Sequence, residues 1–281
     1  MLVTNDVALI TFVPFTCSLL QRDDQRKILL RIVVIEAAAA NLGSMATPIG
    51  NPQNLYLYST YSFSLGTFFK TILPIVGISY IGLLFSLLLI PQQPLAAEIP
   101  TESNLPLSAQ KKNFIIYSIL GVVCLATVAG LVTHVFCFCV VLLGIIVTDR
   151  ALIRRVDWEL LLTFVCFFLF SGNLQQIEPV RNLMMQGLSG GVCLTAALVS
   201  QVISNVPAAV LLSGFTEQGK ELLLGVDIGG LGTPIASLAS LIAYQYYAKS
   251  KLANPAKYLQ FFFIYQFIGL FLLLAIKFIM L

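Results

Sequence analysis

Long apolar segments alternate with short polar ones along the 281 residues of this chain. Several of the apolar segments approach the ~20 residues that a helix needs to cross a bilayer. The pattern predicts single membrane-spanning helices over 66–90, 113–133, 135–148, 158–176 and 258–281. A shorter apolar piece, 7–20, follows the polar residues Thr4, Asn5 and Asp6. The pattern as a whole predicts an all-α integral membrane protein.

Two apolar segments are interrupted by glycine, proline and polar residues, which predicts broken transmembrane helices. The first covers 28–58 and opens over Asn41–Leu55, which reads NLGSMATPIGNPQNL; the second covers 219–248 and opens over Asp227–Pro234. Proline donates no backbone hydrogen bond and clashes with the preceding turn, so a helix breaks or opens there. In a membrane, an opened helix persists only where protein buries it or where it lines a watery cavity. Transporters place their substrate sites at such breaks, so each opening is a candidate half-site.

Composition and charge agree with a membrane protein and predict its orientation. The chain is 58% hydrophobic and 10% charged, whereas a soluble domain averages about 25% charged residues. Eleven loop Lys and Arg residues would lie on one side of the membrane and three on the other. The loops on the basic side are 21–27, 91–112, 149–157 and 249–257. This bias predicts that the four loops are cytoplasmic and that the C-terminus is external.

The sequence contains an internal repeat. Thr47-Pro48-Ile49 recurs as Thr233-Pro234-Ile235, 186 residues later. The same offset aligns Gly43 with Gly229 and Leu55 with Leu241. Upstream, the tip Thr4-Asn5-Asp6 pairs with Ser204-Asn205-Val206, which lies inside the predicted re-entrant hairpin 183–215. Because the two opened helices would run in opposite directions, we expect inverted repeats with two half-sites facing each other near the membrane midplane.

The repeat also predicts a division of the chain. Residues 1–90 would be the remainder of the first repeat, 91–112 a cytoplasmic linker, and 113–281 the second repeat, with three spans, the hairpin, a broken helix and a final span. The second half has 91 residues before its tip, counted from Asn113 up to but not including Ser204, whereas the first half has three before Thr4. Because both halves contribute to such a site, we expect roughly 90 residues to be missing at the N-terminus.

Four motifs resemble the ion transporter superfamily. They are Thr4-Asn5-Asp6, Asn41 to Leu55, Asp157-Trp158-Glu159-Leu160-Leu161, and Ser204-Asn205-Val206-Pro207. That superfamily includes arsenite pump membrane subunits, a class of sodium–proton antiporters, citrate–metal transporters and divalent-anion–sodium symporters. The resemblance covers essentially the whole chain and identifies the superfamily without a substrate. It implies an all-α membrane fold of inverted repeats with re-entrant hairpins and broken transmembrane helices.

In the symporter branch of that superfamily, the hairpin tips carry Ser-Asn-Thr, and substrate and sodium bind between the tips and the opened helices. Carried over, the resemblance implies binding by Thr4, Asn5, Asp6, Ala46, Thr47, Pro48, Ser204, Asn205, Val206, Gly232, Thr233 and Pro234. Asn51 and Asn54, in the first opened stretch, complete the predicted set. Asp6 and Val206 stand where that branch has threonines, so a dicarboxylate would lose two hydroxyl donors and meet a negative charge.

Three acidic residues in apolar segments, Asp6, Asp227 and Glu36, are candidates for ion or proton coupling. A carboxylate at the centre of a membrane helix costs roughly 2.5–3.5 kcal/mol on insertion scales, so it tends to face a wet cavity or a partner. Asp6 could bind sodium or carry the coupling proton, or it could be an N-cap at a hydrated tip. Asn5 and Asn205 likewise could bind a cation or polar substrate or could cap their helices.

The sequence offers little for metal or catalytic chemistry. Its six cysteines lie in apolar runs without CxxC spacing, and its only histidine, His134, lies between two apolar runs. Cysteines in such surroundings pack as small apolar side chains. We therefore expect no metal site, no catalytic activity, and no cofactor other than a coupling sodium ion or proton.

The sequence thus favours a secondary active transporter of a small anion or oxyanion, citrate-like or arsenite-like, coupled to sodium or protons. Two alternatives stay open: a sodium–proton antiporter, and a truncated fragment that does not transport. The expected location is the cell membrane, crossed several times. The expected partners are a small inorganic or organic ion and the lipid bilayer, with a homodimer as a candidate assembly and no nucleic acid.

Overall fold

The computed structural model describes residues 4–91, 107–148, 150–154, 156 and 158–280. Within these residues every regular element is a helix, which confirms the predicted all-α class. The chain forms two compact units, one of Met1–Glu98 with Phe167–Leu281 and the other of Ile99–Cys166. The predicted division into two repeats joined by a linker stays a prediction.

The first part of the larger unit contains the elements of the first predicted repeat. They are α1 (Asn5–Leu19), the short 3-10 helix η1 (Asp23–Gln25), α2 (Arg26–Ser44), α3 (Pro52–Thr60) and α4 (Leu65–Leu88). The interruption between α2 and α3 confirms the first broken helix. Pro52 is the first residue of α3, where its missing N–H costs nothing. The Asn51 side chain caps this helix by accepting the Asn54 N–H at 3.0 Å.

The second part of the larger unit repeats this order after three additional helices, the last part of α8 with α9 and α10. Its elements are the later part of α8 (Trp158–Leu174), then α9 (Glu178–Ser189), α10 (Val192–Ile203), α11 (Asn205–Ser213), α12 (Gly219–Ile228), α13 (Leu238–Ala248) and α14 (Pro255–Met280). The interruption between α12 and α13 confirms the second broken helix. Helices α10 and α11 pack against each other around Ser204, which confirms a helical hairpin.

The hairpin is shorter than predicted. Residues 183–189 belong to α9, and the first arm begins at Val192. The small residues that follow Leu188 end α9, and Gly191 has a φ of 138°, which a residue with a side chain rarely adopts. The arm was predicted to begin at 183, whereas in the structure it begins at Val192, after the turn at Gly190 and Gly191.

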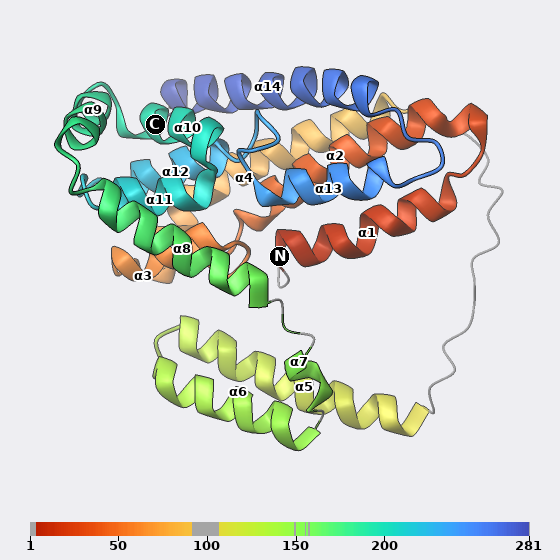
Figure 1. The fold of residues 1–281 in the computed structure, drawn as a ribbon, viewed down its shortest axis with the longest axis horizontal. Coiled ribbons are helices and arrows are strands. Elements are labelled where there is room, and N and C mark those ends of the chain that lie inside the picture. Colours follow the sequence, from red (N-terminus) through yellow and green to blue (C-terminus); the bar gives the residue numbers. More distant parts are fainter. Residues whose placement is uncertain (1–3, 92–106, 149, 155, 157, 281) are drawn as a thin grey trace. The chain divides into compact units, whose positions relative to one another are not determined.

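The broken helices exchange halves between two bundles. Helices α1, α2 and α13 pack together, and helices α3, α11 and α12 pack together with α10 beside them (Figure 1). Each bundle has its own apolar core. Because α3 follows α2 and α13 follows α12, each broken helix has one half in either bundle. Both breaks and both hairpin tips consequently lie at the junction between the bundles.

The smaller unit contains α5 (Leu107–Val128), α6 (His134–Thr148) and α7 (Ala151–Arg154). Helices α5 and α6 pack together, with Gly144 against the side chain of Leu120. Helix α5 begins inside the predicted linker 91–112, and the cytoplasmic placement of that linker stays a prediction. Residues 92–106 and Asp157 lie outside the described residues.

Long apolar helices agree with a membrane protein. By length and composition, α4 and α14 can each cross a membrane, and Leu161–Leu174 with Glu178–Ser189, bent by 92°, gives a third candidate within the described residues. Many large apolar side chains are exposed, such as Ile81 at 68%. In water such exposure would be costly, whereas lipid makes it favourable.

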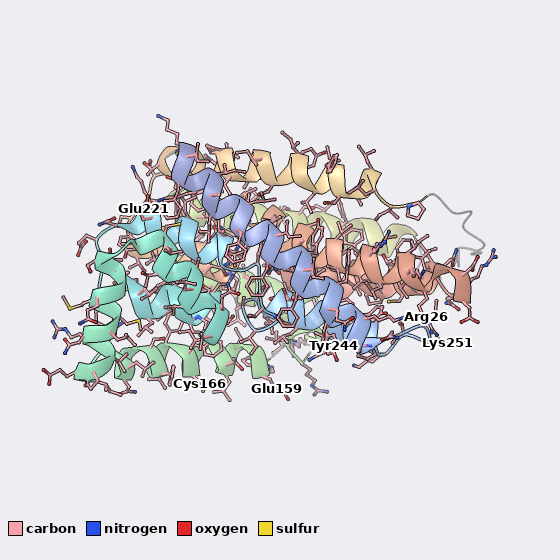
Figure 2. The ribbon with its side chains drawn as sticks, turned by 90° about the horizontal axis from the view of Figure 1, so that it is seen from above. Arg26, Glu159, Cys166, Glu221, Tyr244 and Lys251 are labelled. Carbon is pink, nitrogen blue, oxygen red and sulfur yellow. The ribbon has the colours of Figure 1, made fainter. Side chains whose placement is uncertain are left out.

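Two of the predicted cytoplasmic loops lie at the same end of the larger unit. Figure 2 shows Arg26 and Lys251 at one end and Glu221 at the other. A surface cavity of about 360 Å³ joins the two loops; it is lined by Asp23, Asp24, Arg26, Lys27, Leu30, Asn254 and Lys257. This agrees with the charge-based expectation that 21–27 and 249–257 share one side of the membrane.

Candidate functional site

Each hairpin tip docks onto the break in its own half of the chain. Asn5 and Asn205 are the first residues of α1 and α11, and both are buried, at 5% and 4% exposed. The Asn5 N–H donates to the Gly50 carbonyl at 3.2 Å, and the Asn205 N–H donates to the Ala236 carbonyl at 2.9 Å. Gly50 and Ala236 are 186 residues apart, the offset of the sequence repeat. The repeat in the sequence thus corresponds to a hydrogen bond between tip and break that occurs in both halves.

The two breaks also share a turn. The Gly50 N–H donates to Thr47 O and the Ala236 N–H donates to Thr233 O, each at 3.1 Å. Gly50 is required in the first turn because a Cβ there would lie 2.0 Å from the Ser44 carbonyl oxygen. The Thr-Pro motif therefore builds the same local backbone twice.

Asn41, at the end of α2, connects the first repeat to the second break. Its Oδ1 accepts from the Ser237 hydroxyl at 2.7 Å and from Asn5 Nδ2 at 3.5 Å. Its Nδ2 donates to Ser240 Oγ at 3.3 Å and to the Gly230 carbonyl at 3.4 Å. The Asn41 side chain therefore has partners on both its oxygen and its nitrogen.

Asp227, at the end of α12, makes the reciprocal connection to the first break. It is 186 residues after Asn41 and so occupies the equivalent position. Its Oδ1 accepts from Asn51 Nδ2 at 3.4 Å and from Gln53 Nε2 at 3.3 Å, and the Asn54 amide also lies beside its carboxylate. A residue in the last turn of each opened helix thus forms hydrogen bonds with the break of the other repeat.

We call each of these connections a clamp: Asn41 with its partners at the second break, and Asp227 with its partners at the first. The partners in the two clamps are themselves equivalent. The 186-residue offset aligns Asn51 with Ser237 and Asn54 with Ser240. Neither Asn41 nor the two serines were among the predicted site residues. The offset was visible in the sequence, and extending it residue by residue would have found all three.

The asparagines at the hairpin tips do not occupy the N-cap positions of their helices, as the capping alternative required. The N-cap positions are Thr4 and Ser204, neither with a side-chain capping bond, and the Asn5 Oδ1 instead accepts the Asp6 N–H at 2.9 Å. Ser204 has φ 74° and ψ 154°, a region that is strained for a residue with a side chain. Its hydroxyl donates to the Ala236 carbonyl at 3.3 Å. Strained backbone of this kind is typical of functional sites.

The acidic candidates have different surroundings. Asp6 lies in the first turn of α1 rather than at its N-cap, and its Oδ1 is buried without a hydrogen-bond partner in the described structure. Glu36 lies in the contact between α1 and α2, where its carboxylate accepts from the Thr16 hydroxyl. The structure therefore places Asp6 and Asp227 next to the tips and breaks, and gives Glu36 a partner in the α1–α2 contact.

Several predicted residues shape the breaks through their hydrogen bonds. Asn54 Nδ2 donates to the Met45 and Thr47 carbonyls at 3.3 and 3.4 Å. The Thr233 hydroxyl donates to the Gln201 carbonyl at 2.9 Å. Ala46 and Pro48 lie in the first break, and Gly232 and Pro234 lie in the second. Val206 follows Asn205 in α11.

Gln201 is a further residue that the sequence reasoning missed. It lies in the first hairpin arm and spans the second break: its Nε2 donates to the Gly229 and Leu231 carbonyls at 2.8 and 2.9 Å, and its Oε1 accepts the Thr233 N–H at 2.8 Å. Gly232, with φ 107°, passes so close that a Cβ would lie 2.1 Å from the Gln201 Oε1. No local signal marks this glutamine, because its role depends on tertiary packing.

Helix ends set the electrostatics of the junction. Helices α1, α3, α11 and α13 begin there, and α2 and α12 end there. Helix N-termini carry partial positive charge and unpaired N–H groups, and helix C-termini carry partial negative charge. None of the residues described at the junction is basic. It therefore offers backbone N–H groups to an anion, and two carboxylates with helix C-termini to a cation.

Comparisons with known proteins identify a family and several relatives. The family described as citrate transporter matches residues 1–217. An uncharacterised transporter of Methanocaldococcus jannaschii is 33% identical over 242 residues, which are 86% of this chain and 65% of the relative. The inner membrane protein YbiR of Escherichia coli is 32% identical over 249 residues, which are 85% of this chain and 64% of the relative. An uncharacterised transporter of Mycobacterium tuberculosis is 25% identical over 247 residues. The chain thus spans less than two thirds of the length of these relatives.

Proposed function

This chain belongs to the citrate transporter family, and on that premise we propose that it is a secondary active transporter of a small, oxygen-rich anion or oxyanion. The substrate would be citrate-like or arsenite-like, and its movement would be coupled to sodium or protons. The protein would cross the cell membrane several times. The observation that carries the proposal is the duplicated docking of a hairpin tip on a helix break, Asn5 on Gly50 and Asn205 on Ala236.

The helix ends give this proposal its chemistry. An oxyanion would bind where α1, α3, α11 and α13 begin, because their N-termini present N–H groups and partial positive charge. A coupling cation would be stabilised by the ends of α2 and α12 and by Asp6 or Asp227. Opposite charges would then occupy one junction, which is what coupled transport of an anion with a cation requires. Alternating access would come from movement of the two repeats around this junction.

The proposal can be tested by flux measurements on the purified protein in lipid vesicles. We expect uptake or efflux of at least one member of a panel that includes citrate and arsenite, driven by a sodium or proton gradient. Asn205→Ala should abolish this flux while the protein still inserts, because the variant removes the amide at the second tip. The matched control is Asn173→Ala, whose exposed side chain donates within its own helix to the Leu169 carbonyl. Normal flux in the Asn205 variant would refute the half-site argument.

Sodium–proton antiport is a second candidate, favoured by the two junction carboxylates, Asp6 and Asp227. It predicts that sodium addition collapses a pH gradient across the vesicle membrane in the absence of any anionic substrate. An inserted, folded chain that carries no solute of the panel and leaves the pH gradient intact would instead support the non-transporting fragment.

A further inference from the structure

Two buried oxygen atoms at the first break lack a hydrogen-bond donor. Asp227 is 2% exposed and Asn54 is fully buried. The Asp227 Oδ2 and the Asn54 Oδ1 have no hydrogen-bond partner within the described part of the chain. Burial of a polar atom without its bond costs free energy, so native proteins rarely leave such atoms unpaired. Each of these acceptors therefore requires a donor that the described residues do not supply.

The orientation of the Asn54 amide follows from its own contacts. Its Nδ2 donates to two carbonyls, those of Met45 and Thr47. Rotating the amide would place its oxygen against those carbonyl oxygens and lose both bonds. The oxygen is therefore the end left unpaired, and the Asn54 amide lies beside the Asp227 carboxylate.

Resting on the proposed function, we propose that Asp227 is the proton carrier of this transporter and that the proton binds its unpaired Oδ2. One proton, taken from the aqueous phase on one side of the membrane, binds the carboxylate and neutralises it. The same proton leaves on the other side and restores the carboxylate. The Oδ2, which has no partner in the described structure, then carries a hydrogen that it can donate at the first break.

The equivalent position in the first repeat supports this assignment. Asn41 is neutral, and both ends of its amide are hydrogen-bonded. A protonated Asp227 has the same pattern, one accepting oxygen and one donating group, so it would complete the second clamp as Asn41 completes the first. The ionised form leaves that clamp incomplete. Protonation would therefore strengthen the contact between α12 and the first break, which links the proton to the geometry of the site.

A proton fits these surroundings better than a sodium ion. The groups that contact Asp227 Oδ1 are the amide nitrogens of Asn51 and Gln53, which present hydrogens rather than oxygens. A metal cation needs several oxygen ligands, whereas a proton needs one lone pair and one acceptor.

Within the described residues, the hydrogen-bond partners of the Asp227 carboxylate are neutral amides, and no charged side chain pairs with it. Helix α12 packs against α2, α3, α4, α10, α11 and α14. The charged and titratable residues on these helices, with those on α12 itself, are Arg26, Lys27, Arg31, Glu36, Tyr56, Tyr58, Lys70, Tyr80, Cys193, Lys220, Glu221, Lys257, Tyr258, Tyr265 and Lys277. Of these, Lys277 and Glu221 pair with each other.

The test uses Asp227→Asn, which resembles the protonated form and should therefore fold. In vesicles, we expect accumulation driven by a proton gradient to fall by roughly tenfold or more, as for a typical coupling between two sites. Exchange of labelled for unlabelled substrate should persist, since exchange needs no net proton movement. The matched control is Asp24→Asn, whose exposed carboxylate pairs with Arg22 at the short helix η1. Full proton-driven accumulation in the Asp227 variant would overturn the proposal. So would a wild-type protein that is driven by sodium alone and loses that drive in the variant.

A second measurement does not depend on any substrate. Infrared difference spectra between acidic and basic samples should show the carbonyl band of a buried carboxylic acid in the wild type. That band should vanish in Asp227→Asn, persist in Asp24→Asn, and shift in Asn54→Leu, which removes the amide beside the carboxylate. A transporter inactive on the whole panel that still shows this band would refute the proposed function and keep the proton site. An unchanged band in Asp227→Asn would refute the proton site even if transport is found.

Discussion

Replacing Gly50 by alanine tests the geometry on which the site depends. The added Cβ would lie 2.0 Å from the Ser44 carbonyl oxygen and 2.8 Å from the Ser44 carbonyl carbon. Both atoms belong to the backbone, so no side-chain rotation relieves the clash, and the turn must move away from the end of α2. Overpacking of this kind costs about 1–3 kcal/mol. Movement of the turn also lengthens the Asn5–Gly50 bond, which contributes about 1 kcal/mol more.

The matched control is Gly77→Ala in α4, where a Cβ meets nothing within 4 Å. A helix-interior glycine replaced by alanine should gain roughly 0.5–1 kcal/mol. Thermal unfolding in detergent and flux in vesicles measure the two effects. We expect Gly50→Ala to unfold at a temperature several degrees lower and to lose transport, and Gly77→Ala to match or exceed the wild type in both. A Gly50 variant as stable and active as the wild type would refute the close approach of the first break to α2.

Three further results are expected. Gln201→Leu should lower both stability and flux, because it leaves two carbonyls and one N–H of the second break unpaired, each at about 1–3 kcal/mol; unchanged thermal unfolding would contradict this. Lys277→Met should cost about 3 kcal/mol, the low end for a broken buried pair, because Glu221 is partly exposed; the double variant with Glu221→Gln should recover part of that loss. In a cysteine-free background, Lys251→Cys should react with an impermeant thiol reagent only from the cytoplasmic side and Glu217→Cys only from outside, and the reverse pattern would invert the orientation.

The broken helices and the hairpin were predictable from the sequence because they are local and duplicated. Proline and glycine interrupt an apolar segment wherever they occur, and the Thr-Pro repeat marked both positions. The hairpin tip at Ser204 followed from a polar pair between two apolar arms. The boundary of the arm was missed, although the Gly190-Gly191 pair that separates 183–189 from the arm is a turn signal in the sequence.

The contacts that join the two repeats were harder to predict. Gln201 holds the second break from a different helix, and nothing in its neighbouring sequence distinguishes it from an ordinary glutamine. Lys277 lies near the end of a span, where a lysine commonly extends toward the interface; in the structure it is 7% exposed and pairs with Glu221. Both results depend on which helices pack together, and the apolar pattern does not determine that.

The difference between Asn41 and Asp227 has a consequence for how such a site can work. Two asparagines at these positions would give a symmetric junction with two neutral clamps and no place for a proton. Two aspartates would place two like charges in one buried junction, at a high desolvation cost. One of each allows a single charge to appear and disappear in one half only, while the other half stays fixed. A duplicated fold therefore needs only one substituted position to make one of its two clamps sensitive to protons.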